Sequence, residues 1–329
     1  LKEVMELFPS EYIHIGGDEA STNHWTDQMQ ESTNEALRQL PVRLLIADYT
    51  DSSKAKAMSL AMNATADIPY DAVVIMDADN TAGTSFLSEL NPVFQSGARA
   101  VQAHRTAKNT NTDIAVLDAA SEEINNSIFR SGHIALGFSS ALIGSGMALE
   151  AQWFRQHVPQ LETAGEDKEL ESLLLKQRIH IEYLEHVHVK DEKTQKKEVI
   201  KNQRKRWIAA QFDSLSRALP SFPGELLRGN INYCDKVFQW TLLPRIVLIF
   251  CTFFFTIIFT IVHPHMSIKW WILSFSLFLA LFTAIPKRML NKRLLQGILQ
   301  LPSLLAGIVS NLFKLKGVNK QFIHTEHDH

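Results

Sequence analysis

The sequence has few cysteines and no excess of basic residues. Cys234 and Cys251 are the only cysteines among 329 residues, and Cys251 lies in an apolar segment, so neither a disulfide framework nor a thiolate zinc site is expected. The 33 Lys and Arg residues are balanced by 35 Asp and Glu residues, whereas nucleic-acid binders concentrate basic charge. No nucleic-acid partner is therefore expected. No charged and then apolar leader follows Leu1, which predicts that a signal peptide and the natural start are both absent.

Apolar residues make up 46% of the chain, enough for a sizeable core, and they gather near its C-terminal end. Two uncharged runs stand out, Ile246–Val262 and Trp270–Ile285. With their flanks they approach the roughly 20 apolar residues that cross a bilayer. We predict transmembrane helices at about 242–262 and 270–286, joined by the short loop His263–Lys269.

Basic residues flank this predicted hairpin on both sides, whereas its loop holds only Lys269. The positive-inside rule then places both flanks in the cytoplasm, in a multi-pass protein of the inner (plasma) membrane. Residues 296–315 are amphipathic and contain Pro302, which favours an interfacial or re-entrant helix over a third span. The flanking basic residues are Arg228, Lys236 and Arg245 before the hairpin, and Lys287, Arg288, Lys292 and Arg293 after it.

Strand and helix patterns alternate in the first half of the chain, which is typical of an α/β fold with parallel βαβ units. The predicted strands are Val42–Ala47, Ala72–Met76 and Ala98–Ala103, and the predicted helices are Ala55–Ala64 and 112–130.

The run Ala72–Asn80 ends a buried strand in two carboxylates, Asp77 and Asp79. Ligands of α/β sheets bind beyond the carboxyl ends of the strands, and two hard oxygen donors there suit Mg²⁺ or Mn²⁺ carrying a nucleotide diphosphate. Asp and Asn are also common turn and cap residues, so on this segment alone the two interpretations weigh equally.

Three further segments are each ambiguous. Gly144-Ser145-Gly146 is expected to lead into a helix and lets the backbone approach a ligand, but such a loop is weak evidence. Glu166 and Asp167 open a predicted helix, where acidic residues are favoured in any case. The basic stretch Asn202–Trp207 begins another helix, which could face an anionic surface or simply solvent.

Between these segments, Ile179–Val189 alternates as a strand and Lys190–Lys201 is predicted to be a charged loop. His180, His186 and His188 follow the strand, and since no carboxylate or cysteine stands in metal-ligand spacing with them, we interpret them as structural.

The first 25 residues resemble a different kind of protein. A short strand, Tyr12–Ile15, is followed by Gly16-Gly17-Asp18-Glu19, which resembles the active-site motif of family 20 glycoside hydrolases, the β-hexosaminidases. The resemblance implies Glu19 as general acid and Asp18 as the residue that orients the substrate acetamido group. That fold needs roughly 250 residues of alternating strands and helices, and nothing after residue 40 supplies them. We therefore expect an orphan segment.

From about residue 33 the order of motifs resembles membrane-bound family 2 glycosyltransferases, in which a GT-A domain precedes transmembrane helices. The matching pieces are Asp77-Ala78-Asp79 (the Asp-x-Asp motif), Gly144-Ser145-Gly146-Met147 (the acceptor-side loop), Glu166-Asp167 (the Glu-Asp motif) and Gln203-Arg204-Lys205-Arg206-Trp207 (Gln-x-x-Arg-Trp). Lys54 matches a weaker donor-side segment.

This resemblance implies a role for each matching residue. Asp79 would bind the divalent ion, Asp77 the nucleotide, and Asp167 would be the general base that deprotonates the acceptor hydroxyl. Gln203, Arg206 and Trp207 would hold the diphosphate and the acceptor. The implied function is inverting transfer from a nucleotide-diphosphate sugar to a lipid or polysaccharide acceptor at the cytoplasmic membrane face. The implied acceptor-binding residues are Gly144, Ser145, Gly146, Met147 and Glu166.

The implied fold is a Rossmann-like GT-A nucleotide-diphospho-sugar transferase domain, N-terminally truncated, followed by transmembrane and interfacial helices. The predicted parts are a hexosaminidase-like fragment and seam (1–32), the transferase domain (33–227) and the membrane region (228–329). The family's first strand should precede residue 33, where the foreign fragment stands, so we interpret the chain as a chimera with a donor pocket open on one side. A catalytically inactive membrane protein and, third, an N-acetylhexosaminidase fragment remain as alternatives.

Overall fold

The computed structural model describes residues 43, 45, 53–163, 165–195, 197–302 and 305. The predicted strands Tyr12–Ile15 and Val42–Ala47, together with Asp18 and Glu19, lie outside the described residues or are too sparsely covered to assess. The predicted interfacial stretch 296–315 is described only in its first part.

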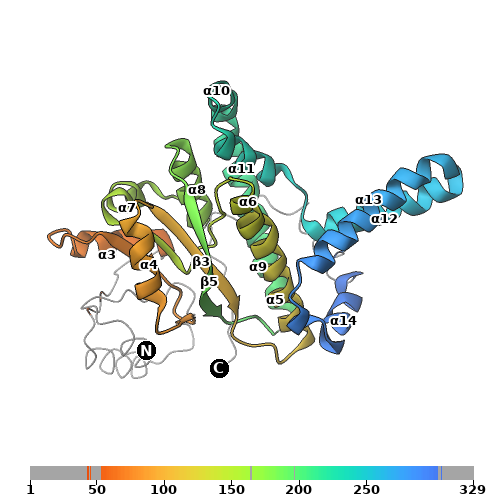
Figure 1. Ribbon diagram of the computed structural model, residues 1–329, viewed down its shortest axis with the longest axis horizontal. Helices are drawn as coiled ribbons and strands as arrows, with labels where there is room; N and C mark the ends of the chain where they lie inside the picture. Colours follow the sequence, from red (N-terminus) through yellow and green to blue (C-terminus); the bar gives the residue numbers. More distant parts are fainter. Residues whose placement is uncertain are drawn as a thin grey trace.

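A five-stranded mixed sheet forms the centre of the described chain (Figure 1). Its order is β1-β4-β3-β5-β2, where β1 is Ala72–Ile75, β2 is Thr81–Ala82, β3 is Ala100–Ala107, β4 is Met147–Glu150 and β5 is Ile181–Asp191. β3 and β5 pair in parallel, with Ala100 opposite Ile181 and a register shift between Ala103 and His104. β4 runs antiparallel to both β1 and β3, and β2 runs antiparallel to β5. The mixed α/β architecture is confirmed, while the expectation of uniformly parallel units is wrong.

The segment after Gly144-Ser145-Gly146 accounts for this difference. It enters strand β4 and not a helix, because its apolar residues fill the gap between β1 and β3, with Leu149 paired to both Val73 and Ala100. The helix α7 (Ala151–His157) begins only after the strand has ended.

Alternation along the strands divides the core between the two faces of the sheet. Val101, Ala103 and Ala148 pack with α4 (Phe86–Gln95). Ala100 and Leu149 pack with α3 (Lys54–Ala64), α7, α8 (Glu166–Lys176) and α11 (Ile231–Thr241). Both sets of side chains are fully buried, so the sheet is covered on each side.

Helix starts follow ordinary capping chemistry. The Ser53 hydroxyl accepts from Lys56 N at the start of α3, and Thr112 accepts from Ala115 N at the start of α5 (Asp113–Asn126). α5 continues through a π-helical segment, Ser127–Ser131, into α6 (Gly132–Ala135). The predicted helices 55–64 and 112–130 are confirmed within a few residues.

The polar end of the sheet is longer than predicted. β3 continues past Ala103 through His104 and Arg105, and β5 extends to Asp191. α9 (Lys197–Ala218) starts inside the predicted loop 190–201. Short elements complete this half of the chain: the 3-10 turns Val158–Gln160 and Leu219–Ser221, and α10 (Phe222–Leu227).

Two long apolar helices, α12 (Arg245–Val262) and α13 (Pro264–Thr283), form a hairpin that extends away from the sheet domain (Figure 1). Only His263 separates them, because Pro264 takes the first helical position where its missing N–H costs nothing, so the predicted loop 263–269 is shorter than expected. The chain then returns through a 3-10 turn, Lys287–Met289, to α14 (Lys292–Leu299).

Candidate functional site

The carboxylate turn, residues 77–80, follows β1 directly. Asn80 organises it, because its side-chain amide donates to Asp79 Oδ1 at 3.0 Å while its Oδ1 accepts from the Asp77 backbone N at 3.3 Å. The Asn80 backbone N also donates to Asp77 O at 3.0 Å and closes the turn. Asp77 and Asp79 are therefore held at the strand end, as the sequence predicts.

Lys54, the first residue of α3, joins this turn to two other predicted segments. Its ammonium group contacts the Asp77 carboxylate and donates to Gly144 O at 2.9 Å. The same Nζ lies 3.7 Å from Glu166 Oε1 at the start of α8. Residues 54, 77, 144 and 166, spread over more than 100 positions of sequence, thus meet around one cation.

Gly144 is required where the loop passes this cluster. Its φ is +81°, and a Cβ there would lie 3.4 Å from Glu166 Oε1 and 3.8 Å from Lys54 Nζ. These are ordinary contact distances, so it is the positive φ that would strain a side chain there and that favours glycine. The loop is fixed from below by Gln102, whose Nε2 donates to Ser145 O at 3.0 Å and whose Oε1 accepts from Ile143 N at 3.1 Å. Met147 is fully buried within β4.

The first two residues of α8, Glu166 and Asp167, differ in environment. Burial, together with the neighbouring Asp167, raises the pKa of Glu166 to about 7 against the opposing attraction of Lys54. Asp167 accepts from the Lys168 backbone N at 2.8 Å and lies in the first helical turn. Asp167 is thus anchored by the backbone at the helix start, next to the buried Glu166.

The helix α9 carries the remaining predicted residues, Gln203, Arg206 and Trp207. They recur at helical spacing with Ala210, so all four lie along one stripe. Ala210 abuts Gly165, where a Cβ would lie 2.9 Å from the Ala210 Cβ, and the stripe therefore adjoins the start of α8. Trp207 is 41% exposed, and Gln203 Oε1 is buried without a hydrogen-bond partner among the described residues. An aromatic surface and a vacant acceptor are thus present on this stripe.

A divalent cation fits the donor set of the carboxylate turn. Asp77 and Asp79 offer hard carboxylate oxygens, and Mg²⁺ commonly takes one or two carboxylates and completes its shell with phosphate oxygens and water. Within the described ranges, no group of three or more His, Cys, Asp and Glu residues could hold a metal ion. Two protein ligands with the substrate supplying others is therefore the arrangement that these residues allow.

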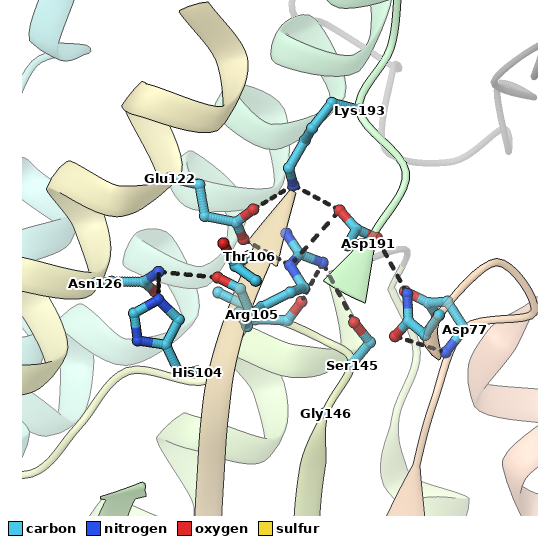
Figure 2. A network of polar contacts seen from close by, with 12 residues as sticks. Asp77, His104, Arg105, Thr106, Glu122, Asn126, Ser145, Gly146, Asp191 and Lys193 are labelled. Carbon is cyan, nitrogen blue, oxygen red and sulfur yellow. Dashed lines mark hydrogen bonds and ion pairs between the residues drawn. The ribbon is translucent and has the colours of Figure 1, made fainter. Parts of the chain in front are cut away.

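Four charged residues behind the turn were not predicted: Arg105, Glu122, Asp191 and Lys193. They contact one another and reach both the carboxylate turn and the glycine loop (Figure 2). A signal for two of them exists in the sequence. The buried positions of β5 alternate, and continuing the series past Val187 and Val189 places Asp191 and Lys193 inward as a pair of opposite charge.

Comparison with known proteins identifies the domain that carries this site. Residues 72–283 match the family described as Glycosyl transferase family group 2, which is more than half of the 329 residues. This chain belongs to that family. The mixed sheet followed by two apolar helices is accordingly the GT-A-type architecture that the sequence predicts.

Residues 1–54 match another family, described as Glycosyl hydrolase family 20, catalytic domain. The family group 2 chain thus begins with a segment of glycosidase type, and the predicted chimera of two families is confirmed. Among curated protein sequences, none matches the chain.

Two solved glycosyltransferase structures are similar to this family group 2 protein. One is a mannosyltransferase from Pyrobaculum calidifontis in complex with GDP-Man and Mn²⁺, with 14% identity, a TM-score of 0.45, and coverage of 90% of this chain and 76% of the other. The second is glucosyl-3-phosphoglycerate synthase from Mycobacterium tuberculosis in complex with phosphoglyceric acid, with 14% identity, a TM-score of 0.37, and coverage of 57% and 65%.

Proposed function

We propose that the chain transfers a hexose with inversion from a nucleotide-diphosphate sugar to a lipid or polysaccharide acceptor at the cytoplasmic face of a membrane. The observation that carries the proposal is the meeting of Asp77, Gly144 and Glu166 around Lys54. Three segments that sequence reasoning assigns to donor, acceptor and catalysis share one cation, and they do so in a chain of the glycosyltransferase family.

The residues divide the chemistry between them. Asp77 and Asp79 would hold Mg²⁺ or Mn²⁺, which supplies charge stabilisation for the departing nucleotide diphosphate. Lys54 offers a second positive charge beside Asp77, and Arg206 a third from α9. The side chains of Gln203 and Trp207 offer a hydrogen-bond acceptor and an aromatic face for the sugar and acceptor.

Asp167 acts as the general base. As the acceptor oxygen bonds to the anomeric carbon and the bond to the diphosphate breaks, the acceptor proton passes to an Asp167 carboxylate oxygen. Glu166, held beside Lys54, lines the same space from the acceptor side. The Gly144-Ser145-Gly146 loop is assigned to the acceptor side by the family resemblance, and its Gly144 carbonyl accepts from the same Lys54 ammonium group.

Two features support a membrane location. α12 and α13 are long and apolar enough to cross a bilayer, and large apolar side chains along both are exposed, among them Phe254, Ile261, Ile272 and Phe278. The chain enters the hairpin from the sheet domain and returns to it afterwards. The candidate site and both ends of the hairpin would therefore lie on the same side of the bilayer, with the catalytic domain at the inner (plasma) membrane.

The test is sugar transfer by membranes carrying the full chain, compared with Asp167→Asn and with Asp67→Asn, an exposed carboxylate outside the site, as control. We expect Asp167→Asn to lower turnover by at least about 100-fold, the scale of general-base catalysis, with donor KM little changed and the control unaffected. Unchanged turnover in Asp167→Asn would show that the base is another group. Absence of any metal-dependent nucleotide binding by the parent chain would favour the catalytically inactive alternative.

A further inference from the structure

We propose that the central ion cluster, defined as Arg105, Glu122, Asp191 and Lys193, is a positioning device that sets the carboxylate turn and the glycine loop relative to each other. The inference rests on the proposed function, because it assigns the cluster to the donor and acceptor segments of that site. Asp191 acts on the carboxylate turn through Asn80, and Arg105 acts on the glycine loop through Ser145.

The cluster is a closed set of two cations and two anions. Glu122 of α5 accepts from Arg105 Nε at 2.6 Å and also contacts the Lys193 ammonium group. Lys193 Nζ donates to Asp191 Oδ2 at 2.6 Å, and that oxygen lies 3.8 Å from Arg105 Nε (Figure 2). β3, α5 and the end of β5 are thereby tied together at a single point.

One arm of the cluster reaches the carboxylate turn. Asp191 Oδ1 accepts from the Asn80 side-chain amide at 3.1 Å, while the other oxygen of the same carboxylate, Oδ2, accepts from Lys193. The same amide nitrogen donates to Asp79 Oδ1 at 3.0 Å. The position of the Asp79 carboxylate therefore depends on Asp191, which lies 112 positions later in the chain.

The other arm reaches the glycine loop. Arg105 Nη1 donates to Ser145 Oγ at 3.3 Å and to Ile143 O at 3.4 Å. A weaker extension leads toward α9, where Arg204 Nη2 lies 4.0 Å from Asp118 Oδ1 one turn before Glu122. The donor and acceptor segments thus contact the cluster directly, whereas the α9 segment approaches it only through Asp118, one turn from Glu122.

The charges are costly to bury and are held in place by each other. Burial opposes ionisation of Glu122, but Arg105 and Lys193 outweigh it and lower its pKa to about 2. The pKa of Lys193 is raised by Glu122 and Asp191 against the same burial penalty. Glu122, Arg105 and Lys193 thus each hold their charge more firmly than in water, since the pKa of the acid is lowered and those of the two bases are raised. Buried ion pairs often stabilise less than apolar replacements would, so we attribute the presence of the cluster to the geometry that it imposes.

Hydrogen–deuterium exchange of the full chain in detergent tests the proposal without a donor substrate. We expect Lys193→Met to raise exchange about tenfold in both segments 77–82 and 143–146 while α4 and α13 stay as in the parent. Lys193→Arg should restore most of the protection. Asn80→Ala, which leaves all four charges intact, should loosen only the first segment, and Asn91→Ala on the surface of α4 is the matched control. Unchanged exchange in both segments, or a uniform rise over the chain, would overturn the proposal.

Should Lys193→Met fail to fold, Asp191→Asn and Asn80→Ala decide the question. Both substitutions remove the hydrogen bond between Asn80 and Asp191. Their effects on exchange in segment 77–82, and on the Mn²⁺ concentration that half-saturates transfer, should therefore not add in the double variant. Additive effects would contradict the proposal. If the parent transfers no sugar while exchange responds as expected, the proposed function fails and the positioning role stands.

Discussion

Glu166 is the residue whose surroundings differ most from those of an ordinary helix-capping acid. It is 8% exposed, its pKa is raised to about 7 by burial, and Lys54 compensates its charge only in part because Asp77 shares the same ammonium group. A carboxyl that is half protonated near neutrality can accept or donate hydrogen bonds. The charge and the hydrogen bonding of Glu166 beside Lys54 therefore depend on pH.

This environment predicts a pH-dependent stability. Because the folded-state pKa of Glu166 exceeds its ordinary value of 4.5, the folded chain loses stability as pH rises from about 5 to 7, and the loss is complete above that range. Glu166→Gln removes this loss, so its advantage over the parent should grow with pH by up to about 3 kcal/mol. Thermal unfolding midpoints in detergent at pH 5 and pH 8 check this, with Glu89→Gln on α4 as control. A difference between variant and parent that is the same at both pH values would contradict it.

At this scale the sequence predicts residues that stand at element ends, and it misses those that depend on tertiary pairing. Asp77, Asp79 and Glu166 follow from a strand end and a helix start. Lys193 stands in a run of charges and reads as solvated, yet it is 4% exposed because Glu122 and Asp191 neutralise it. Continued alternation along β5 points to Lys193 and Asp191, but no local pattern indicates the further partner, Glu122 on α5.

At the scale of elements, α14 shows how the C-terminal region is fastened to the sheet domain. Gly297 packs directly on α5, where a Cβ would lie 2.8 Å from Asp113 O and 3.1 Å from Leu117 Cβ. Asn291 caps α14 by accepting from Leu294 N at 3.0 Å, and Arg293 Nη1 donates to Thr110 O at 2.9 Å. The opposite side of α14 exposes Leu295 and Leu299, as expected for a helix at a membrane surface.

Gly297→Ala separates packing from helix propensity. Alanine would favour a helix by about 1 kcal/mol, but the contact with backbone atoms of α5 cannot relax without moving one helix, at a cost of about 1–3 kcal/mol. We expect a lower unfolding midpoint and faster hydrogen exchange in α5. Gly224→Ala in α10, where a Cβ meets nothing within 4 Å, is the control and should leave both unchanged or slightly improved. A Gly297→Ala chain as stable as the parent would show that α14 is not closely docked.

The elements themselves were predicted well where the local pattern is strong, as for α3, β1 and the two apolar helices. The direction of β4 could not be predicted, because a run of three apolar residues before Glu150 fits a parallel strand, an antiparallel strand or a helix equally. Its pairing with β1 on one side and β3 on the other decides the matter, and both are distant in sequence.

At the scale of the whole molecule, the hairpin is built as a unit. Thr256 is fully buried between the helices, where its hydroxyl is 2.8 Å from Ser274 Oγ and donates to Trp270 O at 3.2 Å. Large apolar side chains such as Phe255 and Phe275 are exposed along both helices. Of the basic flanking residues, Lys236 is buried in an ion pair with Glu171 at 2.7 Å, so the orientation depends on the others.

The proposed orientation can be measured by cysteine labelling in a chain carrying Cys234→Ser and Cys251→Ser. His263→Cys, at the tip of the hairpin, should react with a membrane-impermeant maleimide in intact cells, whereas Lys292→Cys, after the hairpin, should react only after permeabilisation. Equal reactivity of both positions in intact cells would show that the hairpin does not span the membrane.

The central claim, that the carboxylate turn serves metal-dependent transfer from a nucleotide-diphosphate sugar, is tested most directly by nucleoside diphosphate release. Membranes carrying the parent chain or Asp79→Asn are supplied with a panel of donors, with Mn²⁺ or with chelator. We predict release from at least one donor that requires the metal and falls by at least about 100-fold in Asp79→Asn. Release that is equal in the two chains, or no release from any donor, would contradict the account.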